Sequence, residues 1–328
     1  MSRLDLRTLA CLLLPPMMWA GNAVVGHLLV HDVPPVALNA LRWLLVAALL
    51  MPWARCMLGG WRPIRERWLY LAAIGVLGVG SYNTLQYLAL RTSSPINVTL
   101  IGASVPIWMM VVGAVGFSQP IQPRQWLGAA LCASGVLLVI AKGRWETLQQ
   151  VELVPGDLLM LLASLCWAIY SWLLAKPPAS MQGDRRPPWD WAAFLQIQVL
   201  FGLMWAGACT ALEAVWTAGR YASMWPTTLY GWLALLFIAV GPSIVAYRGW
   251  ALGVQAVGPT LAAFFGNLIP IFAALWSALF LGQHPSWYHP VALGLITCGI
   301  AVNSRAGRSP GRADQADQVR SDGGHRGT

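Results

Sequence analysis

Charged residues are scarce in this sequence. Only 10% of its 328 residues are Asp, Glu, Lys or Arg, whereas soluble domains carry about 25%. Hydrophobic residues make up 57% of the chain, and 19 of its residues are tryptophan. A chain of this composition cannot cover a folded surface with charge in water. The composition therefore excludes an ordinary soluble domain and indicates an integral membrane protein.

The positive net charge does not indicate a nucleic-acid-binding protein. The net charge is +9, from 21 basic and 12 acidic residues. The basic residues are spread over short connectors and the C-terminal segment, whereas a nucleic-acid-binding protein gathers them on one face of a domain. We therefore expect the lipid bilayer, and no nucleic acid, as a partner of this chain.

Cysteine is also scarce, and its spacing excludes the usual cysteine chemistry. No C-x-x-C pair occurs, and no cysteine stands at metal-ligand spacing from a histidine. Neither a disulfide framework nor a metal site is indicated, and we expect no cofactor. The cysteines fall within or at the end of apolar segments, where they act as small buried residues: Cys11, Cys56, Cys132, Cys166, Cys209 and Cys298.

Long apolar segments fill most of the chain. A helix needs about 20 apolar residues to cross the hydrocarbon core. No alternating pattern typical of barrel strands appears, and an open sheet cannot satisfy its edges in lipid. The pattern predicts an all-α membrane protein of ten transmembrane helices: 8–30, 36–54, 68–90, 95–117, 124–141, 157–175, 191–212, 228–250, 259–281 and 287–303.

The connectors between these segments carry an asymmetric charge. With the N-terminus in the cytoplasm, that side receives most of the arginines, including Arg62, Arg65 and Arg67. The opposite side receives few basic residues: Arg91, Lys142, Arg144 and Arg220. Because short cytoplasmic loops are enriched in Lys and Arg, both termini are expected in the cytoplasm.

One apolar stretch occurs twice. A shift of 164 positions places residues 94–117 on 258–281, with Gly102 on Gly266 and Pro106 on Pro270. Each half would hold five spans, an odd number, so the halves enter the membrane with opposite polarity as inverted repeats. The expected organisation is a first repeat, a connecting loop, a second repeat and a disordered cytoplasmic tail: 8–141, 142–156, 157–303 and 304–328.

Several stretches are similar to the drug/metabolite transporter superfamily, EamA type. Residues 19–50 resemble its opening hairpin, and 87–108, 126–140 and 249–283 resemble its later helices. The resemblance implies a ten-helix carrier in the cell inner membrane that commonly exports amino acids or related metabolites. Members often have Gly-Glu at the end of the fourth or ninth helix. This chain has Ser118-Gln119 and Gly282-Gln283 there, so we do not expect a mechanism that needs this carboxylate.

Polar and aromatic residues near mid-depth of the spans are the expected substrate site, because polar groups inside a bundle usually face a cavity. The expected substrate-binding residues are Trp19, Asn22, Ser81, Tyr82, Asn83, Gln86, Ser104, Ser164, Trp167, Tyr170, Ser243, Tyr247 and Asn267. Pro106 and Pro270 are expected hinges, because each frees a backbone carbonyl at mid-membrane. Arg42 either binds a substrate carboxylate or pairs structurally within the bundle.

No acidic residue lies near the middle of a span. Proton-coupled carriers usually need a buried carboxylate whose charge switches during transport. His27 is the one residue well inside a span that would change charge near neutral pH. The sequence therefore favours facilitated transport over strict proton coupling.

The sequence predicts a secondary transporter, an exporter of small organic metabolites such as amino acids, and not an enzyme. An exporter of lipophilic cations is the first alternative, disfavoured because no buried acid is present. A membrane-embedded lipid-modifying enzyme is the second. It is disfavoured because no cluster of His, Asp and Glu occurs and the loops are short.

Overall fold

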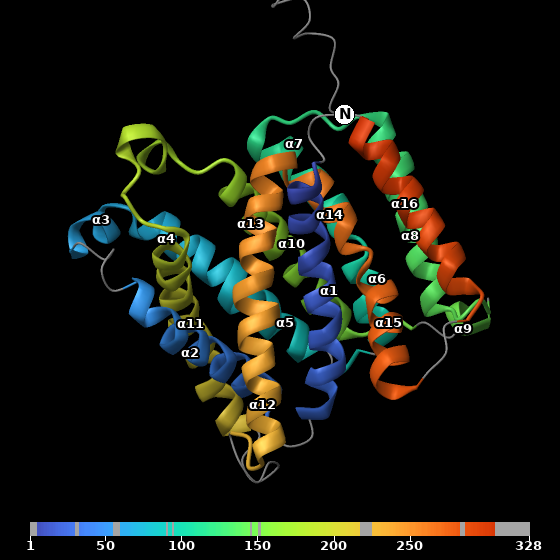
Figure 1. Cartoon of the computed structure of the whole chain (residues 1–328), viewed down its shortest axis with the longest axis horizontal. Coiled ribbons are helices and arrows are strands. Elements are labelled where there is room, and N and C mark those ends of the chain that lie inside the picture. Colours follow the sequence, from blue (N-terminus) through green and yellow to red (C-terminus); the bar gives the residue numbers. More distant parts are fainter. Residues whose placement is uncertain are drawn as a thin grey trace, which may run out of the picture.

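The computed structural model describes residues 5–29, 33–54, 60–89, 91–93, 95–144, 146–149, 152–216, 225–282 and 286–305. Within these ranges every regular element is a helix, and the helices pack as one bundle (Figure 1). Seven helical stretches of the described residues are long and apolar enough to cross a membrane, and Val36–Pro52 is a shorter apolar helix. Gln283 and the expected tail beyond residue 305 lie outside the described residues.

The first half of the chain contains α1 (Leu6–Leu29), α2 (Pro35–Ala54), α3 (Trp61–Glu66), α4 (Trp68–Ile74), the π-helix η2 (Gly75–Ser81), α5 (Tyr82–Ala89), α6 (Pro95–Gly102), α7 (Val105–Phe117), α8 (Pro123–Ile140) and the short α9 (Glu146–Gln149). The second half contains α10 (Pro155–Ala175), the short 3-10 helices η3 (Ala179–Met181) and η4 (Gly183–Arg185), α11 (Trp191–Trp216), α12 (Leu229–Ile238), the π-helix η5 (Ala239–Val245), α13 (Ala246–Val257), α14 (Pro259–Gly266), α15 (Ile269–Leu281) and α16 (Tyr288–Arg305). Ser304 and Arg305, expected in the tail, form the end of α16.

The two spans with an expected proline hinge are each broken into two helices. A two-residue turn separates α6 from α7 and another separates α14 from α15. Pro106 and Pro270 then stand at the second position of the following helix. Proline clashes with the carbonyl four residues before it in a helix interior, but it fits the first turn well. Both later helices begin 164 residues after their earlier counterparts, so the sequence register is kept in the local structure.

The π-helices η2 and η5 also stand 164 residues apart. Their wider turns disturb the ordinary helical hydrogen bonds and leave carbonyls for side chains to satisfy. The hydroxyl of Tyr247 donates to the Gly78 carbonyl at 2.6 Å. The indole nitrogen of Trp19 donates to the Pro242 carbonyl at 3.1 Å. Aromatic side chains from other helices thus hold both irregular segments in place.

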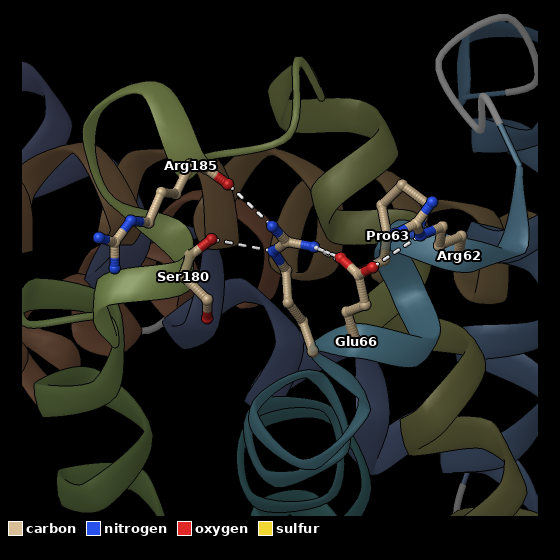
Figure 2. A network of polar contacts seen from close by, with 6 residues as sticks. Arg62, Pro63, Glu66, Ser180 and Arg185 are labelled. Carbon is tan, nitrogen blue, oxygen red and sulfur yellow. Dashed lines mark hydrogen bonds and ion pairs between the residues drawn. The ribbon is translucent and has the colours of Figure 1, made fainter.

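An arginine joins two connectors at one end of the bundle. Arg67, between α3 and α4, donates to the carbonyls of Ser180 and Arg185, each at 2.9 Å, in the segment that follows α10 (Figure 2). It also contacts the Glu66 carboxylate, which accepts a 2.9 Å bond from Arg62. The bond from Arg62 holds the pKa of Glu66 below its usual range. This network links segments more than a hundred residues apart in the chain.

Gly78→Ala is expected to destabilise the bundle. A methyl group at Gly78 would lie 2.5 Å from the ring of Tyr170, which is 1% exposed and packs against the rings of Trp167 and Tyr247. Overpacking of this kind costs about 1–3 kcal/mol. The apparent melting temperature in detergent should fall for Gly78→Ala and stay unchanged for Gly207→Ala, whose new methyl meets nothing within 4 Å. Equal melting temperatures would contradict the close approach of η2 to α10.

Candidate functional site

A cavity of about 380 Å³ lies between helices from both halves of the chain. Its volume is within the range of about 300–1,000 Å³ that small-molecule sites occupy. It is lined by Trp19, Asn22, Leu38, Arg42, Tyr82, Asn83, Gln86, Tyr87, Val98, Thr99, Gly102, Ala103, Val105, Val136, Met160, Trp167, Tyr247, Trp250, Ala263, Gly266, Asn267, Ile269 and Pro270. The lining comes from α1, α2, α5 to α8, α10 and α13 to α15, so segments far apart in the sequence share one space.

An aromatic cluster forms one wall of the cavity. The ring of Trp167 on α10 lies 5.3 Å from both Trp19 and Trp250, measured between ring centroids. It lies 5.1 Å from Tyr82 and 5.6 Å from Tyr247. Edge-to-face and tilted pairs of this kind contribute about 0.5–1.5 kcal/mol each beyond the area they bury. The wall is therefore a firm apolar surface against which the flat or apolar part of a ligand can pack.

The polar part of the lining is neutral except for one residue. Amide side chains reach the cavity from α1, α5 and the turn after α14: Asn22, Asn83, Gln86 and Asn267. Arg42 on α2 is the single charged residue of the lining and is 2% exposed. Among the described residues no group of His, Cys, Asp and Glu could hold a metal ion. The arrangement can bind and orient a small polar solute, and it offers no nucleophile paired with a base.

Most of the residues expected at a substrate site meet in this one cavity. Those that line it are Trp19, Asn22, Tyr82, Asn83, Gln86, Trp167, Tyr247 and Asn267, together with Arg42 and the expected hinge Pro270. They come from six spans of the two halves of the chain.

The other expected residues lie outside the lining: Ser81, Ser104, Ser164, Tyr170, Ser243 and the expected hinge Pro106. Three of the serine hydroxyls bond to carbonyls of their own spans. Ser104 donates to Ile101 at 2.6 Å and Ser243 to Ile238 at 2.9 Å, and Ser164 bonds one turn back in α10 in the same way. A hydroxyl that donates to its own backbone has used its one proton and can only accept from a ligand.

Sequence reasoning missed Trp250 on α13. Its indole nitrogen donates to the Ser171 hydroxyl at 3.1 Å, and its ring lies 5.5 Å from that of Trp19. A signal was present, because Trp250 stands three residues after Tyr247 and therefore on the same helical face. Tyr87, Thr99 and Met160 also line the cavity without having been expected there.

Aromatic packing joins α7 to α10 at the end where both helices finish. The indole nitrogen of Trp172 donates to the Met109 carbonyl at 2.7 Å, and its ring stacks on Phe117 at 5.1 Å. Lys176 donates to the Phe117 carbonyl at 3.1 Å. In Figure 1 this end of α7 lies on the same side of the bundle as the beginning of α1. None of these residues lines the cavity.

Comparison with known proteins agrees with this architecture. A family model described as the EamA-like transporter family matches residues 6–141 and 154–305. The chain is 24% identical over 271 residues to a protein of Ancylobacter novellus named aromatic amino acid exporter YddG, covering 82% of this chain and 88% of that one. It is 26% identical over 298 residues to a protein of Salmonella typhimurium named probable amino-acid metabolite efflux pump, covering 89% and 92%.

A solved crystal structure shares the fold, with a TM-score of 0.69 at 21% sequence identity, and the match covers 92% of this chain and 96% of that chain. The family model matches each half of the chain separately, over nearly all of the bundle. The chain is a multi-pass membrane protein and belongs to the EamA-like transporter family.

Proposed function

We propose that this protein is a secondary transporter that exports small organic metabolites such as amino acids. The observation that carries the proposal is the cavity between the two family-matched segments, with one aromatic wall, neutral amides and no catalytic group. Relatives named as an aromatic amino acid exporter and as a probable amino-acid metabolite efflux pump support this substrate class.

The proposed architecture is ten membrane-spanning helices in two inverted five-helix repeats, 8–141 and 157–303, with a connecting loop at 142–156 and a tail at 304–328. It is supported by the recurrence of broken spans and π-helices at a spacing of 164 residues. The arginine-rich connectors support both termini in the cytoplasm, with the protein in the cell inner membrane.

The transport cycle is proposed to alternate access to the cavity between the two sides of the membrane. The breaks at 103–104 and 267–268, beside Pro106 and Pro270, are the proposed hinges, because short helices on either side can tilt without bending a helix interior.

Transport is proposed to follow the solute gradient without strict proton coupling. No acidic residue lines the cavity, and the His27 side chain lies outside the described residues. The deciding experiment is reconstitution in proteoliposomes loaded with a panel of amino acids, with and without an imposed pH gradient. Solute flux that is equal under both conditions supports the proposal. Proton flux in fixed ratio to solute flux would overturn it, and no flux of any solute would overturn the transport function itself.

Gly266→Leu is expected to reduce transport without unfolding the protein. A new Cβ at Gly266 meets nothing within 4 Å, and Gly266 lines the cavity, so a leucine side chain would occupy space that the solute needs. Loss of fit of this size lowers transport at least about tenfold.

Gly116→Leu on α7 is the matched control, since its Cβ is equally free but lies outside the lining. Uptake into proteoliposomes and melting temperature should be measured for both variants. Full activity of Gly266→Leu would show that solute passes elsewhere.

A further inference from the structure

Arg42 is a buried cation without a counter-ion among the described residues. It makes no ion pair and no hydrogen bond to any of them, and its Nε is buried with no partner. Its guanidinium carbon lies 4.8 Å from the centre of the Trp43 ring. Its guanidinium carries a positive charge and several N–H donors but no acceptor.

The surroundings of Arg42 compensate its charge only in part. A buried charge is normally paired, because removing it from water is expensive. The face of Trp43 attracts the cation, but a ring face does not pair with several in-plane N–H donors at once. In the interior of a membrane bundle, an ionisable side chain of this kind marks a ligand pathway. An anion that enters the cavity would therefore supply the counter-ion that Arg42 lacks among the described residues.

The rest of the cavity limits what this anion can be. Arg42 is the only charged residue in the lining, so the cavity matches one negative group better than a dianionic phosphate. A planar carboxylate meets a guanidinium through two parallel hydrogen bonds. The aromatic wall around Trp167 suits an apolar body. The side-chain oxygen of Asn22 is buried without a partner and can accept from an ammonium group of the same ligand.

We propose that Arg42 docks the carboxylate of the transported solute and selects solutes that carry one carboxylate on an apolar or aromatic body. This inference rests on the proposed transport function and adds the residue that sets its specificity. Arg42 acts by direct contact with the solute. The solute's carboxylate in turn supplies the counter-ion that the described part of the protein does not provide.

Four compounds with one phenyl body test the proposal: phenylalanine, 3-phenylpropionate, phenylalaninamide and phenethylamine. Binding is measured on the purified full chain in detergent by quenching of tryptophan fluorescence, and uptake is measured in proteoliposomes. The two carboxylates are expected to bind about 10- to 100-fold more tightly than the amide and the amine, the range expected for charge-assisted hydrogen bonds.

Two variants separate the charge of Arg42 from its packing. Arg42→Met keeps an unbranched apolar stem and removes the charge, so carboxylate binding should fall about 10- to 100-fold while binding of the amide, which carries only a positive charge, should not fall. Its melting temperature without ligand should equal or exceed that of the wild type, because an unpaired charge is lost. Arg42→Lys keeps the charge without the planar guanidinium, so its affinity for carboxylates should lie between that of the wild type and that of Arg42→Met.

Arg248→Met is the matched control. Arg248 also lies over an indole ring, 4.5 Å from the centre of Trp191, but it is exposed and outside the cavity lining. This variant should bind all four compounds as the wild type does. Equal changes in Arg42→Met and Arg248→Met would overturn the assignment.

The outcomes distinguish this inference from the transport function on which it rests. Wild-type protein that takes up the amide and the amine as well as the acids overturns the role of Arg42 and leaves transport standing. A lower melting temperature of Arg42→Met with an unchanged preference for carboxylates also overturns it and makes Arg42 structural. Carboxylate binding that depends on Arg42, in a protein that moves no solute, supports the docking site and contradicts transport.

Discussion

Replacing Trp167 with alanine is expected to abolish transport and to lower the free energy of unfolding by about 3–5 kcal/mol. Trp167 is 5% exposed and stands at the centre of the aromatic wall. Its ring also lies 5.1 Å from Tyr170, on the same helix. Truncation removes these contacts and leaves a void beside the cavity, because neighbouring rings on α1 and α13 are themselves held by hydrogen bonds.

Trp167→Phe separates the functional loss from the structural one. Phenylalanine keeps an aromatic ring in the cluster, so most of the stability should remain, whereas the flat surface presented to the solute shrinks. The measurements are chemical unfolding in micelles and initial uptake rate in proteoliposomes, with Trp232→Ala as the exposed control. If Trp167→Ala protein took up solute at the wild-type rate, the aromatic wall would not be part of the proposed solute path.

The positions of the spans could be predicted from the sequence, because a segment in lipid must satisfy its backbone hydrogen bonds internally and therefore forms a helix. Apolar length and proline position predicted where helices run, and the breaks at 103–104 and 267–268 fall beside the prolines that were singled out. The π-helices could not be predicted. Gly75, Gly78 and Gly80 are compatible with an ordinary helix, and the wider turn depends on side chains such as Tyr247 that bond across the bundle.

The cavity shows a similar limit. Residue type and depth brought Trp19, Asn83 and Tyr247 to the lining. They could not separate these from Ser243, because whether a hydroxyl bonds its own helix or faces a cavity depends on the local turn. The position of Arg42 within a span was evident, but its lack of a partner among the described residues was not. That property depends on every side chain packed around it, which no single-helix pattern contains.

Glu213 is another residue whose role depends on tertiary structure. The sequence placed it at the end of a span, where a solvated carboxylate would be unremarkable. In the structure it is 5% exposed in the last turn of α11. Its carboxylate accepts from the backbone N–H groups of Val36 and Ala37 at 3.3 and 2.9 Å, and Arg91 lies 3.4 Å away. It therefore caps the first turn of α2 from a different helix.

Glu213→Gln is expected to lower the free energy of unfolding by about 2–4 kcal/mol. The first N–H groups of a helix have no partner within the helix, and a carboxylate there also meets the positive end of the helix dipole. The amide keeps the shape but turns a donor toward these donors and leaves Arg91 without its charge partner. The start of α2, the helix that carries Arg42, would lose its fixed position.

Glu66→Gln is the matched control for this substitution. Glu66 is also paired with arginines, but it is exposed on α3, where water and salt screen the pair. Its substitution should leave the unfolding transition in place. Because Glu213 is buried, added salt should not abolish the difference between the two variants. If Glu213→Gln and the wild type unfolded at the same denaturant concentration, the position of α2 would not depend on this carboxylate.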